Sequence, residues 1–260
     1  SASRLVGHTC VSEKFRQSQC RQVRMIPLHK ALRTDAWRGR RAFVVGSGPS
    51  IKGLDLKAIL RDELTIGCNE EYLIEPKIAF CQDVRFFFGD GSPMRVPAKD
   101  NPAWHSSPCP WVLPVFFRGH PDRPDPPYDD HGRIYEIKAA TRPSSEHGGV
   151  EFVWGKSLEE GIYYGANCGL AALNLADVLG ASPVYLLGFD CGSRGGRTHH
   201  HDRYPQEWAM DPSTENVVWR MWADDFRKIA PSVRAKVVNV CPWSGIDCFE
   251  KAEGFTAGGA

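Results

Sequence analysis

One stretch of this sequence, from Asp190 to Asp202, brings histidines and carboxylates close together. It contains three consecutive histidines, His199, His200 and His201. A histidine with an orienting carboxylate suits general acid–base catalysis, and the same residue types bind divalent metal ions such as Mg²⁺ or Mn²⁺. Alternate side chains of an extended segment face the same way, so His199 and His201 would share one face. We therefore take Asp190, His199 and His201 as candidate catalytic residues and as candidate metal ligands.

The segment between Asp190 and the histidines is rich in glycine and carries Arg194 and Arg197. Glycines allow a loop to hinge, and arginines attract anions, so this segment has the composition of a loop that closes on an anionic ligand. A surface loop with incidental histidines is the alternative. The spacing alone does not place the histidines opposite any other motif.

A second candidate site is a glycine turn that follows the apolar run at 42–46. Apolar residues at helical spacing come after the turn, and the backbone N–H groups at such a helix start can hold a phosphate. The turn is not a P-loop, because no Gly-Lys-Ser/Thr follows, and Ile51 stands where the dinucleotide fingerprint has its third glycine. A tight turn without a ligand is the alternative. The residues concerned are Gly46, Ser47, Gly48, Pro49 and Ser50.

Two polar residues follow the next two predicted strands, at 64–67 and 77–81. These residues are Asn69 and Asp83. Open parallel sheets bind ligands at the carboxyl ends of their strands, so both would lie beside the glycine turn in a doubly wound sheet. An amide there can bind a base or a ribose, and a carboxylate can bind a ribose hydroxyl or a metal ion. As isolated residues, both also suit helix or turn caps.

The elements that must position these residues alternate between strand and helix. A helix is predicted at 170–179 and an apolar strand at 184–187, followed by an amphipathic helix at about 214–230 and a strand at 237–240. The aromatic residues of the amphipathic helix are interpreted as core contacts. The predicted fold class is α/β, Rossmann-like and doubly wound, with a mostly parallel sheet and helices on both faces.

The stretch from 93 to 143 differs in composition, because it holds eleven of the nineteen prolines. Regular helix is not expected there. We predict an insertion or lid crossed by one apolar strand at 111–117. Long loops of this kind often have a function, and a structural excursion over the sheet edge is the alternative.

The chain has 260 residues, of which 42% are hydrophobic and 24% charged, a globular composition. It lacks both an apolar stretch long enough to cross a bilayer and a signal-peptide pattern, so we expect a cytoplasmic protein with no membrane partner. Its nine cysteines include no Cys-x-x-Cys pair, which favours buried reduced thiols. The predicted domains are an N-terminal extension at 1–40, a transferase domain at 41–250 and a flexible tail at 251–260.

Positive charge is concentrated at the N-terminus. Residues 1–41 contain ten Lys and Arg against only Glu13 and Asp35, although the whole chain has a net charge of +1. Such a basic segment could contact nucleic acid, and a solvated extension packed loosely on the body is the alternative.

The order of these motifs resembles that of the single-domain, Rossmann-type bacterial sialyltransferases. It is also similar to the MptE-like 6-hydroxymethylpterin diphosphokinases and the motility accessory factor proteins. Phage-encoded proteins of unassigned function carry a similar Thr-His-x-His loop. The motifs that carry the resemblance are Gly46–Ser50, Cys68-Asn69, Tyr164–Gly169, Gly188-Phe-Asp190 and Cys241-Pro-Trp-Ser244.

The sialyltransferase resemblance implies a site for a nucleotide-activated donor and a histidine base, here His199 or His201, that deprotonates the acceptor hydroxyl. The donor-binding residues that it implies are the first loop, Asn69, Asp83, Gly165, Ala166, Asn167 and Ser244. The diphosphokinase resemblance instead implies that Asp83, Asp190 and the histidines help to position Mg²⁺ and ATP.

The sequence therefore predicts a group transferase, with glycosyl transfer to a hydroxyl as the first interpretation. Mg²⁺-dependent diphosphate transfer from ATP and modification of a base in phage DNA are alternatives. The rival from another class is a nucleotide-binding or nucleic-acid-binding protein without catalysis. The expected location is the cytoplasm of a bacterium or of a phage-infected host cell.

Overall fold

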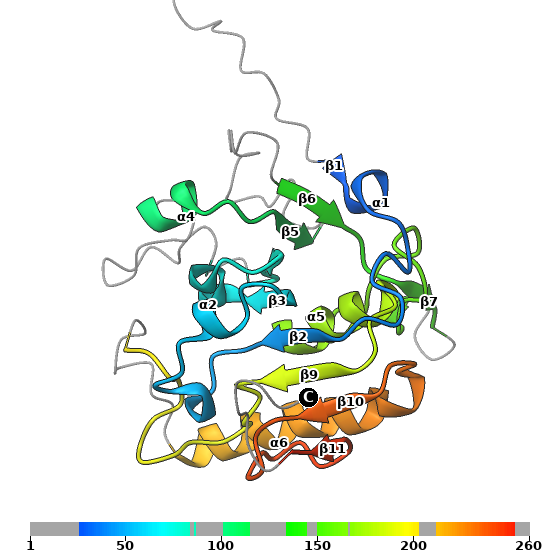
Figure 1. The fold of residues 1–260 in the computed structure, drawn as a ribbon. Helices are drawn as coiled ribbons and strands as arrows, with labels where there is room; N and C mark the ends of the chain where they lie inside the picture. Colours follow the sequence, from blue (N-terminus) through cyan, green and yellow to red (C-terminus); the bar gives the residue numbers. More distant parts are fainter. Residues whose placement is uncertain are drawn as a thin grey trace, which may run out of the picture.

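The fold is an α/β architecture built on one parallel sheet, seen in a computed structural model (Figure 1). The structure describes residues 26–83, 86, 101–114, 134–144, 150–165, 167–202 and 212–252. The strands of the main sheet are β1 (Ile26–Pro27), β2 (Ala42–Val45), β3 (Leu64–Cys68), β4 (Ile78–Phe80), β5 (Trp111–Pro114), β6 (Ile134–Ile137), β9 (Val184–Leu187), β10 (Val237–Asn239) and β11 (Glu250–Lys251). A separate antiparallel pair is formed by β7 (Thr141–Pro143) and β8 (Val150–Phe152).

The strands lie in the order β1-β6-β5-β4-β3-β2-β9-β10-β11, and every pairing in this sheet is parallel. The chain proceeds from β2 through β3 and β4 to one side, then returns to place β9 and β10 on the other. This reversal makes the β2–β9 boundary the topological switch point, where α/β sheets form ligand sites. The predicted Rossmann-like class is confirmed.

Helices cover both faces of the sheet. The α-helices are α1 (Leu28–Ala31), α2 (Leu56–Ile59), α4 (Pro102–Ser106), α5 (Cys168–Val178) and α6 (Pro212–Ile229), and the 3-10 helices are η1 (Pro49–Ile51), η2 (Asn69–Ile74) and η6 (Ala230–Ser232). Val44 of β2 packs with α5 and with Phe226 of α6, whereas its neighbours Phe43 and Val45 pack with Ile51 and with α2. Successive strand residues face opposite sides, so each side needs its own apolar cover.

The N-cap of helix α5 is Asn167, which belongs to the Tyr164–Gly169 motif of the sequence. The side-chain oxygen of Asn167 accepts a hydrogen bond from Leu170 N at 3.0 Å. Ten of the eleven residues of α5 are buried, from Gly169 to Val178, and small side chains allow the helix to lie directly against β2 and β3. Gly180 follows with a φ of +79°, the left-handed conformation that suits glycine after a helix.

The described part of the N-terminal region belongs to the body, and this differs from the predicted extension at 1–40. Strand β1 pairs with β6, and both Leu28 and Trp37 are buried in the main core. The backbone N–H groups of Asp35 and Trp37 donate to Val178 O and Leu179 O. The prediction failed because only a few apolar side chains of this region enter the core. In the sequence they stand among many basic residues, so no apolar pattern is visible. Residues 1–25 lie outside the described residues.

The proline-rich stretch also differs from its prediction. It contributes two strands to the main sheet, β5 and β6, and it also includes β7 and the short helix α4. Prolines do not interrupt these elements, because Pro102 stands first in α4 and Pro110 and Pro114 bracket the buried residues of β5. Whether the rest of the stretch acts as a lid stays a prediction, since 87–100 and 115–133 lie outside the described residues. Among the described residues, no helix is both long and apolar enough to cross a membrane.

Candidate functional site

A pocket of about 150 Å³ opens at the switch point, at the carboxyl ends of β2, β3 and β9. Its walls come from four parts of the chain: the turn after β2, the start of η2, the N-terminus of α5 and the segment after β9. The histidine loop at 198–202 and one face of α6 complete it. The lining residues used below are Gly46, Ser47, Gly48, Asn69, Asn167, Cys168, Asp190, Thr198, His199, Trp219 and Trp222.

The floor of the pocket is formed where the turns after β2 and β9 touch. Gly48 N donates to Gly188 O at 2.9 Å, and Gly188 has a φ of +69°. A Cβ atom on Gly48 would lie 2.6 Å from Gly188 O and 2.7 Å from the Asp190 carboxylate. A Cβ atom on Gly46 would lie 3.0 Å from the same carbonyl. Both glycines are therefore required by the close approach of two backbones.

Asp190 is directed inward, to the start of η1. The carboxylate is 3% exposed and accepts hydrogen bonds from both the backbone N–H and the hydroxyl of Ser50. Burial raises the pKa of Asp190 above its usual range, and the two hydrogen bonds from Ser50 oppose this shift. Asp190 thus occupies the helix start that the sequence assigned to a phosphate.

The other N–H groups of the glycine turn are also largely used within the protein. Gly46 N donates to Leu187 O at 2.8 Å, and Gly48 N donates to Gly188 O. Pro49 has no N–H group. The turn therefore forms part of the pocket surface but offers few backbone hydrogen-bond donors. Donors for a ligand must come mainly from side chains around the pocket.

The histidine loop faces the glycine turn. His200 N donates to Ser47 O at 2.9 Å, which joins the two segments by a backbone hydrogen bond. His199 lines the pocket, and its Nδ1 atom lies 2.8 Å from the hydroxyl of Thr198. His201 stacks on His199 with a centroid distance of 5.6 Å and is not among the lining residues. Of the two candidate bases, His199 is the one at the pocket.

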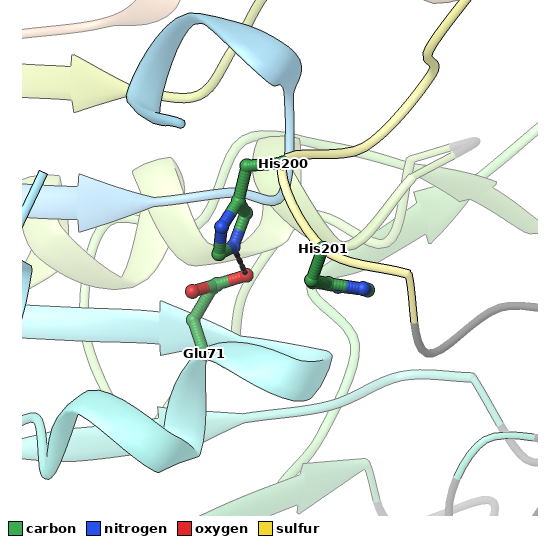
Figure 2. Close-up of side chains that lie close together, drawn as sticks. All are labelled: Glu71, His200 and His201. Atoms are coloured by element: carbon green, nitrogen blue, oxygen red, sulfur yellow. Dashed lines mark hydrogen bonds and ion pairs between the residues drawn. The ribbon is translucent and has the colours of Figure 1, made fainter. Parts of the chain in front are cut away.

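Glu71 is a buried carboxylate beside this loop, and sequence reasoning missed it. It is 1% exposed and accepts a hydrogen bond from Ser47 Oγ at 2.8 Å. It also accepts one from His200 Nε2 at 3.0 Å (Figure 2). One ligand atom each from Glu71, His200 and His201 lie within 4.8 Å of one another. The only signal in the sequence is that Glu71 comes two residues after Asn69, in the segment that follows the same strand.

Part of the pocket wall is aromatic. Trp219 and Trp222 of α6 line the pocket and meet edge to face at 5.0 Å. The sequence interpretation of this helix as a source of core contacts holds for Phe226 and Ile229, which are buried. It is wrong for Trp222, which belongs to the apolar stripe of the sequence but is partly exposed and lines the pocket. Trp219 lies beside that stripe and was not considered.

Comparisons with known proteins give one distant likeness. No family model matches this chain, and no curated protein matches it. A solved structure, that of MAf glycosyltransferase from Magnetospirillum magneticum AMB-1, shares 17% sequence identity with a TM-score of 0.48. The match covers 85% of this chain and 35% of that protein, so this chain spans about a third of its length.

The pocket collects many of the predicted site residues. Gly46, Ser47, Gly48, Asn69, Asn167, Asp190 and His199 all line it. Pro49 and Ser50 lie directly behind in η1, and the carbonyl of Gly165 accepts a hydrogen bond from Gln82 Nε2. Ala166 lies outside the described residues.

Asp83 and Ser244 are not among the lining residues. The carbonyl of Asp83 accepts a hydrogen bond from Cys81 Sγ. Ser244 is buried, and its hydroxyl donates to Phe189 O at 2.6 Å and accepts from Asn239 Nδ2 and Ile246 N. The hydroxyl of Ser244 therefore joins the segment after β9 to the segment after β10.

The predicted metal ligands are divided between two places. Asp190 binds Ser50, and His199 lies against Thr198 at the pocket. Within the described residues, the ligand atoms that gather closely belong to Glu71, His200 and His201, so His201 is the one predicted ligand among them.

Proposed function

We propose that this protein is a group transferase that binds a nucleotide-activated donor in the switch-point pocket and transfers a glycosyl group to an acceptor hydroxyl. The observation that carries the proposal is that an imidazole, side-chain amides and an indole wall meet at one pocket on the carboxyl edge of a parallel sheet. The motif order that resembles sialyltransferases and motility accessory factors agrees with it. In glycosyl transfer from a nucleotide, an imidazole can act as the base, amides can bind the donor oxygens and an indole can pack against a ring.

Asn167 supplies the clearest site for an oxygen atom of the donor. Its Oδ1 atom caps α5, while its Nδ2 atom is buried and has no hydrogen-bond partner in the part of the chain that the structure describes. Leaving a buried donor unpaired costs about 1–3 kcal/mol, which a ligand oxygen recovers. The Asn69 amide lies nearby, since its Oδ1 atom accepts from Cys168 Sγ at 3.2 Å.

The indole wall would bind the ring part of the donor. Trp219 and Trp222 line the same pocket as Asn69 and the glycine turn. A base stacked on an aromatic side chain gains about 1–3 kcal/mol. Sugar rings also pack against indole, so the same wall suits either part of a nucleotide sugar.

His199 is the proposed general base. When its Nδ1 atom carries the proton and donates to Thr198 Oγ1, its Nε2 atom is unprotonated and can accept a proton. This atom takes the proton of the acceptor hydroxyl as the acceptor oxygen bonds to the anomeric carbon, and the nucleotide leaves with the electron pair of the broken bond. Thr198 is then a positioning residue.

Product analysis of purified protein with nucleotide sugars tests this proposal. We expect slow release of free nucleotide from one donor even without acceptor, and a His199→Ala variant should lose about 10²–10⁴-fold in rate. His29→Ala, in the remote helix α1, is the matched control and should keep the rate. Mg²⁺-dependent formation of AMP from ATP would instead favour diphosphate transfer, and no turnover of either kind would favour a binding protein without catalysis.

A further inference from the structure

The cluster of Glu71, His200 and His201 lies beside the pocket but takes no part in the proposed transfer. Figure 2 shows Glu71 rising from η2, directly after β3, toward His200 on the loop that passes over it. His201 follows on the same loop, and its ring lies edge to face with that of His200 at 4.8 Å. Two segments more than 120 residues apart thus bring two imidazoles and one carboxylate together.

A positive charge near Glu71 would compensate the burial of its carboxylate. A carboxylate that is 1% exposed is costly unless hydrogen bonds and a cation compensate it. Its hydrogen bonds come from Ser47 and His200, and within the described residues it forms an ion pair with neither lysine nor arginine. A metal ion held between the carboxylate and the imidazoles would supply the charge.

We propose that Glu71, His200 and His201 bind one divalent transition-metal ion of the zinc class. Two imidazoles and one carboxylate suit Zn²⁺, Co²⁺, Ni²⁺ or Fe²⁺, whereas Mg²⁺ and Ca²⁺ prefer an all-oxygen set. Ligand atoms about 2.1 Å from a tetrahedral ion lie about 3.4 Å apart. The present separations reach 4.8 Å, so a side-chain rotation of partly exposed His201 would complete the set. A fourth position stays open for water.

The ion would link the histidine loop to the segment that follows β3 of the sheet. Glu71 belongs to the segment after β3, and the loop already contacts the turn after β2 through the hydrogen bond from His200 N to Ser47 O. A bound ion adds coordination bonds to this contact. It therefore fixes the neighbouring His199 at the pocket, whichever donor the pocket binds, so the inference does not depend on the identity of that donor.

Calorimetric titration of the full chain, stripped of metal with a chelator, tests the site. We expect Zn²⁺ to bind with a stoichiometry of one per chain and to raise the melting temperature, and Mg²⁺ to do neither at the same concentration. Co²⁺ bound at the site should show visible d–d absorption, which reports its ligands directly. His201→Ala and Glu71→Gln should each weaken Zn²⁺ binding at least tenfold, since each removes one of three protein ligands.

His29→Ala is the matched control, because it removes a histidine from α1, far along the chain from the cluster. It should leave the affinity unchanged. If Glu71→Gln fails to fold, His201→Ala decides the question alone. The proposal is overturned if Zn²⁺ shows no saturable site, if His201→Ala binds as tightly as the unaltered chain, or if Mg²⁺ binds as tightly as Zn²⁺.

Discussion

Gly48 lies where the turn after β2 contacts the turn after β9, and there is no room for a side chain at this position. An added Cβ would be 2.6 Å from Gly188 O, a separation that requires the two turns to move apart. We predict that Gly48→Ala lowers the free energy of unfolding by about 1–3 kcal/mol. Urea denaturation measures this change.

Gly192→Ala is the matched control for Gly48. Gly192 lines the same pocket, and its added Cβ would meet Asp190 O at 3.8 Å, an ordinary contact. This variant should unfold at nearly the same urea concentration as the unaltered protein. Equal stability of the two variants would contradict the tight contact between the turns.

The thiols near the pocket should be inert at neutral pH. Burial raises the pKa of Cys168 to about 11 and that of Cys241 to about 12, so both carry their protons. We predict that iodoacetamide leaves both unmodified in the folded protein at neutral pH and modifies both after denaturation. Peptide mass spectrometry distinguishes the sites, and rapid labelling of folded Cys168 would contradict this prediction.

The same shifts make stability depend on alkaline pH. A thiol whose pKa is higher in the folded state contributes stability that is fully present below its ordinary pKa of 9.0 and is lost as pH rises through about 11. We predict that the urea midpoint falls between these two pH values. A midpoint that rises across this range would contradict the raised pKa of the Cys168 thiol.

For single residues, the sequence predicts membership of the site better than it predicts side-chain contacts. The glycine turn, Asn69, Asn167 and His199 were predicted for a site, and all line one pocket. The inward use of Asp190 could not be read, because its partner Ser50 is 140 positions away. Glu71 was missed for the same reason, since its burial depends on a loop that is distant in sequence.

At the scale of elements, one amide of α5 holds the segment that precedes this helix. Asn174 accepts hydrogen bonds from Gly155 N at 2.9 Å and Tyr163 N at 2.6 Å, and donates to Gly155 O at 3.0 Å. All three groups would be left unpaired in Asn174→Ala. Each unsatisfied buried group costs about 1–3 kcal/mol, so we predict a loss of at least about 2 kcal/mol in the free energy of unfolding.

The control for Asn174 is Asn216→Ala on the exposed face of α6. A substitution at such a site usually changes stability by less than about 0.5 kcal/mol. Chemical denaturation of the two variants side by side separates the buried amide from the exposed one. A similar small effect of both would contradict the role of Asn174.

Elements with strong apolar patterns were predictable from local sequence, and others were not. Strands β2 and β9 are continuous apolar runs, and α5 consists mainly of small and apolar residues, because nearly all residues of these elements are buried. Strand β6 was missed, since its four residues include Glu136 and belong to the stretch at 93–143, which was interpreted as an insertion. Its strand character depends on pairing with β1 and β5, which local pattern does not show.

In the molecule as a whole, the strand order determines the position of the pocket. The sequence predicted a parallel sheet, yet it could not place β9 next to β2, because this pairing joins segments about 140 residues apart. That pairing brings the glycine turn to Asp190 and the histidine loop. The position of the pocket is therefore a property of the topology.

Contact of residues 1–41 with nucleic acid stays a prediction. The described part of this region, from Ile26 onward, packs on the body through β1 and α1. A variant lacking residues 1–25 keeps these contacts and removes part of the positive charge. We expect the full chain to bind DNA with an affinity that falls steeply as salt rises, and the shortened chain to bind much more weakly. Equal binding of both would contradict the prediction.

We expect the switch-point pocket to bind a nucleotide, and a thermal-shift screen measures this binding. The ligands are CMP, UDP, GDP, ADP, ATP and their sugar conjugates, with and without divalent metal. A ligand at 100 times its dissociation constant stabilises a protein by about 2.7 kcal/mol, so binding gives a clear rise in melting temperature. We predict such a rise for one nucleotide or its sugar conjugate, lost in Asn69→Ala and Trp222→Ala and kept in Asn216→Ala. No rise with any nucleotide, or a rise that both pocket variants keep, would contradict the account.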